Sequence, residues 1–251
     1  MPDLILGRDG KVATVRLARP PHNFFDIDLI RDIADALEAN DKDPDVIVTL
    51  LSAEGRSFCA GADFTAREGS GSSSRSLYGE AERIFGRSKP LIAAINGPAV
   101  GGGLGLAVSA DFRIASPAAR FHCNFAMIGL HPGFALTATL PALIGVQKAR
   151  HLMMSARRVS GEEAVEIGLA DQLSGADTLD IDAMTFAQLV ASRAPLALAS
   201  IRGALPRIDR ASARQAMENE AAVQADLYQT ADFKEGVRAN AERRQPLFEG
   251  R

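Results

Sequence analysis

The chain has 251 residues, of which 47% are apolar and 24% are charged, and a net charge of -3 at pH 7. This balance predicts an ordinary globular protein that can bury a full core, as one large domain or as one domain with an appendage. The slight acidity without Lys/Arg clusters argues against nucleic-acid binding. Because no apolar run is long enough to span a membrane and the first residues do not resemble a signal peptide, we expect a cytoplasmic protein without a membrane partner.

The first half of the chain alternates predicted strands with predicted helices. Residues 11–19 alternate apolar and polar side chains, which predicts a strand, and residues 27–44 have apolar side chains at helical spacing. Continuous apolar runs predict buried strands at 45–53 and 90–97, and a helix is expected at 74–88 between them. Repeated strand and helix units predict an α/β fold with a mainly parallel sheet.

The second half is predicted to be mostly helical. A helix is expected at 103–110, short strands at 111–115 and 119–123, and helices separated by loops from about Gly145 onward. The serine-rich run at 67–76 is read equally well as a surface linker or as a loop that controls substrate entry. Two cysteines, Cys59 and Cys123, are too few for a disulfide framework or a zinc site, so we expect reduced thiols and no metal.

A run of three glycines, Gly101 to Gly103, lies between an apolar strand and an apolar helix in "NGPAVGGGLGLAVSADFRIA". A dinucleotide-binding fingerprint is disfavoured because its third glycine would fall on Leu106. No Gly-Lys-Ser/Thr of a P-loop follows, and Ser109 lacks the glycines of a serine-hydrolase elbow. The reading that remains is an oxyanion hole, in which free amides at a helix N-terminus stabilise negative charge on a carbonyl oxygen.

An oxyanion hole needs a second amide, and "EGRSFCAGADF" supplies a candidate because it also follows an apolar strand. The two stretches together resemble the crotonase superfamily, the enoyl-CoA hydratase/isomerase family, and so do "RVSGEEAVEIGLAD" and "TADFKEGVRANAERRQPLF". This resemblance implies a spiral ββα core over residues 1–190 and a C-terminal helical trimerisation region over 191–251. It also implies an acyl-CoA thioester as substrate, with coenzyme A as part of the substrate and no tightly bound cofactor, and a homotrimer or hexamer.

The resemblance further implies which residues form the site. The N–H groups of Ala60 and Gly102 would form the oxyanion hole. The substrate would lie against His22, Phe24, Ala62, Asp63, Phe64, Val100, Gly101 and Phe125. We read Asp63 as a structural residue of its loop.

The chain departs from the family pattern at its acids. The two hydratase glutamates would fall on Gly105 and Phe125, and a further acid used by some relatives would fall on Gly133. Because water addition needs acid/base groups within hydrogen-bond reach, we expect an enzyme that is not a conventional hydratase. The string "GGGLG" is similar to the 4-chlorobenzoyl-CoA dehalogenase branch, but the attacking aspartate of that branch is also replaced, by Gly133.

Few ionisable groups remain near the expected site. His131 in "GLHPGF" is a candidate acid or base, although a structural role is at least as well supported, and His122 and His22 are weaker candidates. Glu80, Glu82 and Tyr78 are read as a solvated helix face, and Arg243 and Arg244 as helix-terminal charges. The leading hypothesis is an enzyme that stabilises a thioester enolate; the alternatives are a degenerate CoA-thioester binding protein and a C–C hydrolase or dehalogenase-like member of the same fold.

Overall fold

A six-stranded sheet forms the centre of the protein in the computed structural model, which describes residues 3–62, 74–205 and 209–251. Its strands, in spatial order, are β1 (Leu4–Asp9), β2 (Val12–Leu17), β3 (Val48–Ala53), β4 (Leu91–Ile95), β6 (Phe112–Ala115) and β9 (Gln172–Leu173). Strand β1 is antiparallel to β2, and the neighbouring pairs from β2 to β9 are parallel. The mainly parallel α/β core expected from the sequence is confirmed.

Helices cover both faces of this sheet. Helix α1 (Ile27–Lys42) begins after Asp26, whose side chain accepts a hydrogen bond from the Leu29 N–H at 2.9 Å, as a helix N-cap does. It packs with α3 (Gly102–Ser109) in the larger core, to which β3 contributes Leu51. Helix α7 (Leu179–Ala191) covers the other face, to which β3 contributes Leu50, so alternate residues of one strand face different helices.

A second, three-stranded sheet consists of β5 (Pro98–Val100), β7 (Arg120–His122) and β8 (Arg158–Ser160). Strand β7 is parallel to β5 and antiparallel to β8. Strands β8 and β9 both follow Gly145, so the expectation of helices and loops alone in that part of the chain is wrong. Both strands are very short, and each is defined by pairing with a strand that lies far away in the sequence, which a local pattern does not reveal.

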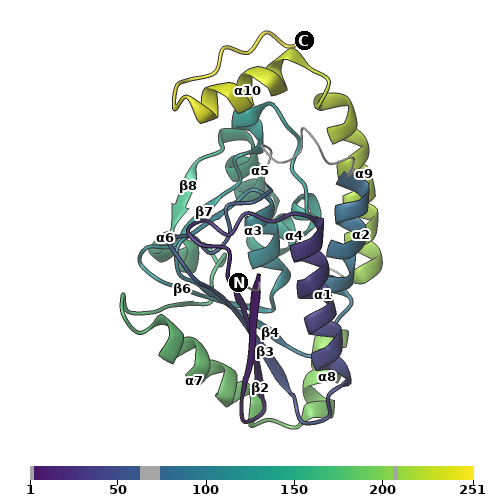
Figure 1. Cartoon of the computed structure of the whole chain (residues 1–251), viewed down its shortest axis with the longest axis vertical. Coiled ribbons are helices and arrows are strands. Elements are labelled where there is room, and N and C mark those ends of the chain that lie inside the picture. Colours follow the sequence, from purple (N-terminus) through teal and green to yellow (C-terminus); the bar gives the residue numbers. More distant parts are fainter. Residues whose placement is uncertain (1–2, 63–73, 206–208) are drawn as a thin grey trace.

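The remaining helices surround the sheets. They are α2 (Ser74–Phe85), the 3-10 helix η2 (Phe125–Ile128), α4 (Leu136–Ile144), α5 (Val146–Ser155), α6 (Gly161–Glu166), α8 (Pro195–Ala204), α9 (Arg210–Leu227) and α10 (Ala231–Ala241). Helix α2 packs between α1 and α9, and α10 lies at the opposite end of the molecule from α7 and α8 (Figure 1).

No single helix in the described ranges is long and apolar enough to cross a membrane. Helices α7 and α8 meet that test only when they are taken as one segment, and that segment is bent by 100°.

Candidate active site

Three segments that are distant in the sequence run side by side at the start of α3. The Phe25 N–H donates to the Gly61 carbonyl at 2.9 Å, and the Val100 N–H donates to the Cys59 carbonyl at 3.0 Å. Isolated bridges pair Phe25 with Ala62 and Cys59 with Ala99. These contacts hold the loop after β3 against the glycine turn. The sequence argument requires this closeness, because it takes the two amides of the oxyanion hole from these two segments.

Two glycines let these segments approach each other. Gly61 has φ of +94°, and Gly101, which precedes α3, has φ of +54°, a region in which residues with a side chain are strained. A Cβ on Gly61 would lie 2.8 Å from the Val100 carbonyl oxygen and 3.6 Å from the Gly102 nitrogen. The two candidate oxyanion segments are therefore in direct contact through a glycine.

The Ala60 amide does not match its expected role. Its N–H donates to the His22 carbonyl at 2.9 Å, so it is already used inside the protein and is not free for a substrate oxygen. By contrast, the N–H groups of Ala62 and Gly102 have no hydrogen-bond acceptor among residues 3–62, 74–205 and 209–251. The expectation for Ala60 is therefore corrected in favour of Ala62, two residues further along the same loop.

These amides lie beside a small cavity of about 50 Å³, which both Ala62 and Gly102 line. Of the residues expected to contact substrate, Val100, Gly101 and Phe125 also line it. Its apolar side chains are Phe25, Leu77, Phe125, Ile128, Leu130 and Phe134, and its polar ones are Tyr78, Asn124, Gln224 and Tyr228. The cavity is thus mostly apolar with a few convergent polar groups, which is typical of a small-molecule site.

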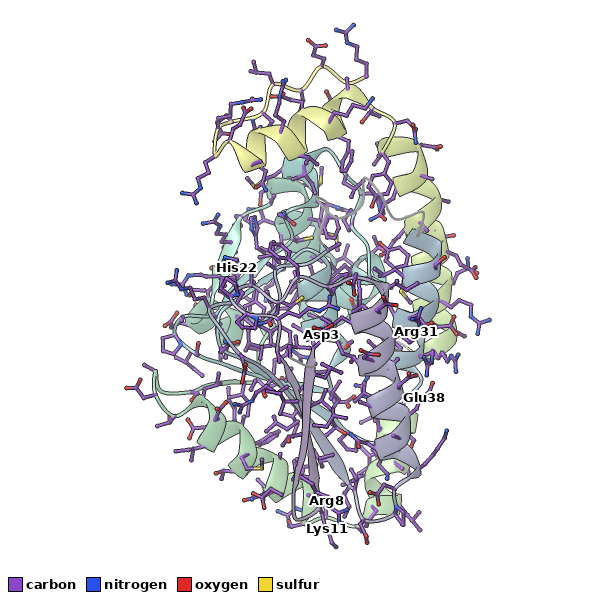
Figure 2. The ribbon with its side chains drawn as sticks, in the orientation of Figure 1. Asp3, Arg8, Lys11, His22, Arg31 and Glu38 are labelled. Carbon is purple, nitrogen blue, oxygen red and sulfur yellow. The ribbon has the colours of Figure 1, made fainter. Side chains whose placement is uncertain are left out.

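Other expected contacts lie elsewhere. The His22 ring contacts the Ser57 hydroxyl at 3.1 Å and the Phe24 ring edge-on, in the loop that precedes α1 (Figure 2). Neither His22 nor Phe24 is among the residues lining the cavity. The expected contacts Asp63 and Phe64 lie outside the described residues.

The candidate acid or base His131 is also absent from the described lining of the cavity. Its Nδ1–H donates to the Pro132 carbonyl at 2.8 Å, and its own carbonyl accepts a hydrogen bond from Gln224. This arrangement supports the structural role of His131 over the catalytic one. The second histidine considered, His122, is buried and donates from Nε2 to the Ala156 carbonyl at 2.8 Å, and burial lowers its pKa.

Helix α2 divides into a charged side and a side that faces the cavity. Glu80 pairs with Arg31 on α1 at 3.2 Å, and Glu82 pairs with Arg210 on α9 at 2.7 Å. These glutamates tie α2 to its neighbours, and only 22% of the Glu80 side chain and 13% of the Glu82 side chain are exposed, so the expectation of a solvated face is wrong for both. The reading of Tyr78 as part of a solvated face is wrong, because Tyr78 is partly buried and lines the cavity. Tyr78, Ala81 and Phe85 share one helical face, a spacing that the sequence offers.

The glycines at the expected acid positions are closely packed. A Cβ on Gly105 would lie 2.5 Å from the Cβ of Phe134, and a Cβ on Gly133 would lie 2.0 Å from the Tyr78 hydroxyl. Real Cβ atoms do not approach other atoms this closely. A side chain at either position would therefore require its neighbours to move.

Buried ionisable groups near the cavity are explained by local structure. The Cys59 and Cys123 thiols are free and buried, which raises the pKa of each to about 12, so both are protonated. Glu220 on α9 accepts hydrogen bonds from the Ala135 and Thr137 amides at the start of α4, at 2.8 and 2.9 Å. Burial raises the pKa of Glu220 to about 7. Sequence reasoning missed this carboxylate, since its partners lie 83 and 85 residues away.

Three further observations concern parts of the described chain outside this cavity. No group of three or more His, Cys, Asp or Glu side chains in the described part of the chain could hold a metal ion. Arg244 pairs with Glu235 and Glu242, in keeping with its reading as a charge of the helical C-terminus. A larger hollow of about 810 Å³ lies among α7, α8 and the start of α9 and contains none of the expected site residues.

Comparison with known proteins identifies the family. The model of the family described as "Enoyl-CoA hydratase/isomerase" matches residues 7–251. The chain is 34% identical over 255 residues to a probable enoyl-CoA hydratase of Bacillus subtilis, covering 98% of each chain. It is 30% identical over 250 residues to the 1,2-epoxyphenylacetyl-CoA isomerase of Escherichia coli, covering 96% of this chain and 95% of the other.

A solved structure, the enoyl-CoA hydratase/isomerase from Pseudoalteromonas atlantica, matches with a TM-score of 0.90 at 30% identity, covering 99% of this chain and all of that one. The chain belongs to the enoyl-CoA hydratase/isomerase family. The expected crotonase-like α/β fold with a helical C-terminal region is confirmed.

Proposed function

We propose that the protein is an acyl-CoA thioester-processing enzyme that stabilises a thioester enolate with the N–H groups of Ala62 and Gly102. The observation that carries this proposal is the pair of amides without an acceptor in the described part of the chain, both at one apolar cavity. Removal of an α-proton from a thioester places negative charge on the carbonyl oxygen. Two fixed donors in a site from which water is excluded stabilise that charge more than the neutral carbonyl.

The same site argues against conventional water addition. Such a reaction needs acid/base groups that hold and activate water, and the positions at which the family pattern places them hold Gly105 and Phe125. Phe134 covers Gly105, and the Phe125 ring is buried against the cavity. The proposed enzyme is therefore an isomerase, lyase or hydrolase of acyl-CoA in which coenzyme A enters as part of the substrate and no tightly bound cofactor is needed.

Deuterium exchange at the α-carbon tests this proposal directly. Wild-type protein in heavy water is expected to incorporate deuterium into an acyl-CoA with α-hydrogens, drawn from a panel of short, branched, alicyclic and aromatic thioesters and read by mass spectrometry. Gly102→Pro would remove one amide, but its Cβ would lie 2.5 Å from the Phe25 ring. Gly61→Ala is the better variant, because its Cβ would force the two amides apart at the Val100 carbonyl.

We expect Gly61→Ala to lower the exchange rate by about a hundredfold, the cost of losing one oxyanion donor. Gly10→Ala is the matched control. Gly10 also has a positive φ, +56°, but a Cβ there would meet nothing within 4 Å, and it lies in the turn between β1 and β2. Equal exchange by both variants would refute the oxyanion assignment. Binding without exchange in the wild type would favour the alternative of a CoA-thioester binding protein, which the lack of acids at the expected positions supports.

The expected trimer or hexamer remains a proposal. The C-terminal end of helix α8 presents Ile201 and Leu205, which lie one helical turn apart, to solvent in the single chain, with 56% and 74% of each residue exposed. Exposed apolar side chains that lie close together mark association surfaces. Sedimentation equilibrium is the measurement that gives the number of subunits.

A further inference from the structure

Two consecutive residues beside the cavity adopt left-handed backbone conformations although neither is a glycine. Phe134 has φ of +61° and Ala135 has φ of +58°, a region that is strained for residues with a side chain. Both residues are buried, and they directly precede α4, which begins at Leu136. Backbone strain of this kind persists only where the surrounding structure imposes it, and it is concentrated at functional sites.

The strained pair gives the cavity one of its walls. The Phe134 side chain lines the cavity, and the centroid of its ring lies 5.8 Å from that of Phe25, which lines it too. A Cβ on Gly105 would lie 2.5 Å from the Phe134 Cβ, so Phe134 fills the space beside α3 that a side chain at residue 105 would take. Because φ sets the direction of the bond from Cα to Cβ, relaxation of the strained backbone would turn this ring away from the cavity.

The groups that impose the strained conformation come from α9. Glu220 Oε2 accepts a hydrogen bond from the Ala135 N–H at 2.8 Å, and its Oε1 accepts from the Thr137 N–H at 2.9 Å and from the Thr137 hydroxyl at 2.6 Å. Gln224, one turn further along the same helix, donates from Nε2 to the His131 carbonyl at 2.8 Å. The loop before α4 is therefore held by α9 at both of its ends.

Glu220 replaces the side-chain cap that α4 lacks. The N-cap residue of α4 is Ala135, whose methyl group cannot accept a hydrogen bond, so the first amides of this helix need an acceptor from another element. A carboxylate has only acceptor positions and can satisfy all three donors at once. Glu220 is buried but is not among the described residues that line the cavity, so it contacts the loop and not a bound acyl group.

We propose that Glu220 is a positioning residue of the acyl site, whose carboxylate holds Phe134 and Ala135 in their left-handed conformations so that the Phe134 ring forms a wall against the acyl group. Glu220 acts through the loop and does not touch the substrate. The inference rests on the proposed function only in that the cavity holds the acyl group of a thioester; it does not require enolate formation.

Calorimetric binding of CoA and of acyl-CoA separates the acyl cavity from the rest of the site. The thioesters are butyryl-CoA, isobutyryl-CoA, cyclohexanecarbonyl-CoA and phenylacetyl-CoA. The measured quantity is the acyl preference, defined as the dissociation constant of CoA divided by that of the thioester. Binding is measured at pH 8, above the pKa of about 7 that burial gives Glu220, so that its carboxyl is ionised.

We expect wild-type protein to bind at least one of these thioesters more tightly than CoA, and Glu220→Gln to lower that acyl preference about tenfold while CoA binds as before. A tenfold change corresponds to about 1.4 kcal/mol, about the contribution of one buried apolar side chain. The physical reason is that an amide at residue 220 would present its NH₂ group to one of the three donors. Glu218→Gln, which changes an exposed residue of the same helix, is expected to keep the wild-type preference.

A second substitution tests whether backbone conformation is what Glu220 supplies. Glycine adopts a positive φ without strain, so Ala135→Gly is expected to restore most of the acyl preference in the Glu220→Gln background. Ala156→Gly is the matched control, because Ala156 also has a positive φ, +48°, but lies at the end of α5 and is not among the described residues that line the cavity. It relieves the same kind of strain and is expected to leave the preference low.

Thermal unfolding of each variant checks that it is folded. If Glu220→Gln does not fold, Thr137→Val takes its place, because it keeps the branched shape of the side chain and removes one of the three donors to the carboxylate. The acyl preference is then expected to fall and to recover with Ala135→Gly. An unchanged preference in folded Thr137→Val would overturn the inference.

The outcomes separate this inference from the proposed chemistry. An acyl preference that falls in Glu220→Gln and recovers with Ala135→Gly alone supports the inference even if no thioester exchanges deuterium, in which case only the enolate proposal fails. An unchanged preference in folded Glu220→Gln overturns the inference, and so does a lost preference that both glycines or neither of them restores; exchange can still support the enolate in these cases. If no thioester binds to wild type more tightly than CoA, both proposals are overturned.

Discussion

Glu220 is expected to make the stability of the protein depend on pH. Glu220 lies on α9, its side chain faces the start of α4, and only 1% of the residue is exposed. Burial raises the pKa of its carboxyl from 4.5 to about 7, although the hydrogen bonds from Thr137 and Ala135 oppose this shift. The native state therefore keeps a proton that the unfolded chain releases in this pH range. Stability from this group is fully present below about pH 4.5 and is lost as the pH rises through about 7.

The size of the effect follows from the change in pKa. One pKa unit corresponds to about 1.4 kcal/mol, so the rise from 4.5 to about 7 is worth about 3 kcal/mol of unfolding free energy. Glu220→Gln has no carboxyl to titrate and lacks this contribution at every pH. The difference in unfolding free energy between wild type and Glu220→Gln should therefore shrink by about 3 kcal/mol between about pH 4.5 and about pH 8.

Urea unfolding at fixed protein concentration measures this difference, since fixing the concentration removes the effect of subunit association on stability. Glu218→Gln is the matched control, because Glu218 lies on the same helix but is exposed. Its curve of stability against pH should follow that of the wild type. If Glu220→Gln also followed the wild type at every pH, the carboxyl would titrate equally in both states and the argument from burial would be refuted.

Two further substitutions test close packing and buried polar groups by urea unfolding. Gly105→Ala should lower the free energy of unfolding by about 1–3 kcal/mol through overpacking, because its Cβ would lie 2.5 Å from Phe134 Cβ. Gly79→Ala is the control and should not destabilise the protein, because nothing lies within 4 Å of a Cβ there. Equal effects of the two substitutions would contradict the packing argument. Arg113→Leu should lower the free energy of unfolding by about 3–5 kcal/mol, because it leaves the buried hydrogen-bond partners of Arg113 unpaired. Arg16→Leu removes only an exposed ion pair and should cost under about 1 kcal/mol. Similar losses for both variants would refute this reasoning.

The sequence determined the features that depend on local chain properties. Apolar runs and their periods predicted the strands β2, β3 and β4 and the helix α1, because burial requires apolar side chains at the spacing of the element. The need for a positive φ at Gly101 is likewise a local property. These features, with the family resemblance, were sufficient to place the candidate site between the loop after β3 and the glycine turn.

The tertiary structure decided which groups of that site are available. The Ala60 amide is occupied by a carbonyl in the loop before α1, and Tyr78 meets Gln224 across 146 residues of chain. Neither contact has a local signal, because the partner of a hydrogen bond is set by the path of the chain in space. The sequence by itself therefore determined where a carbonyl oxygen could be stabilised. Only the packing of α2 and α9 against the cavity placed the polar groups of Tyr78 and Gln224 among its apolar side chains.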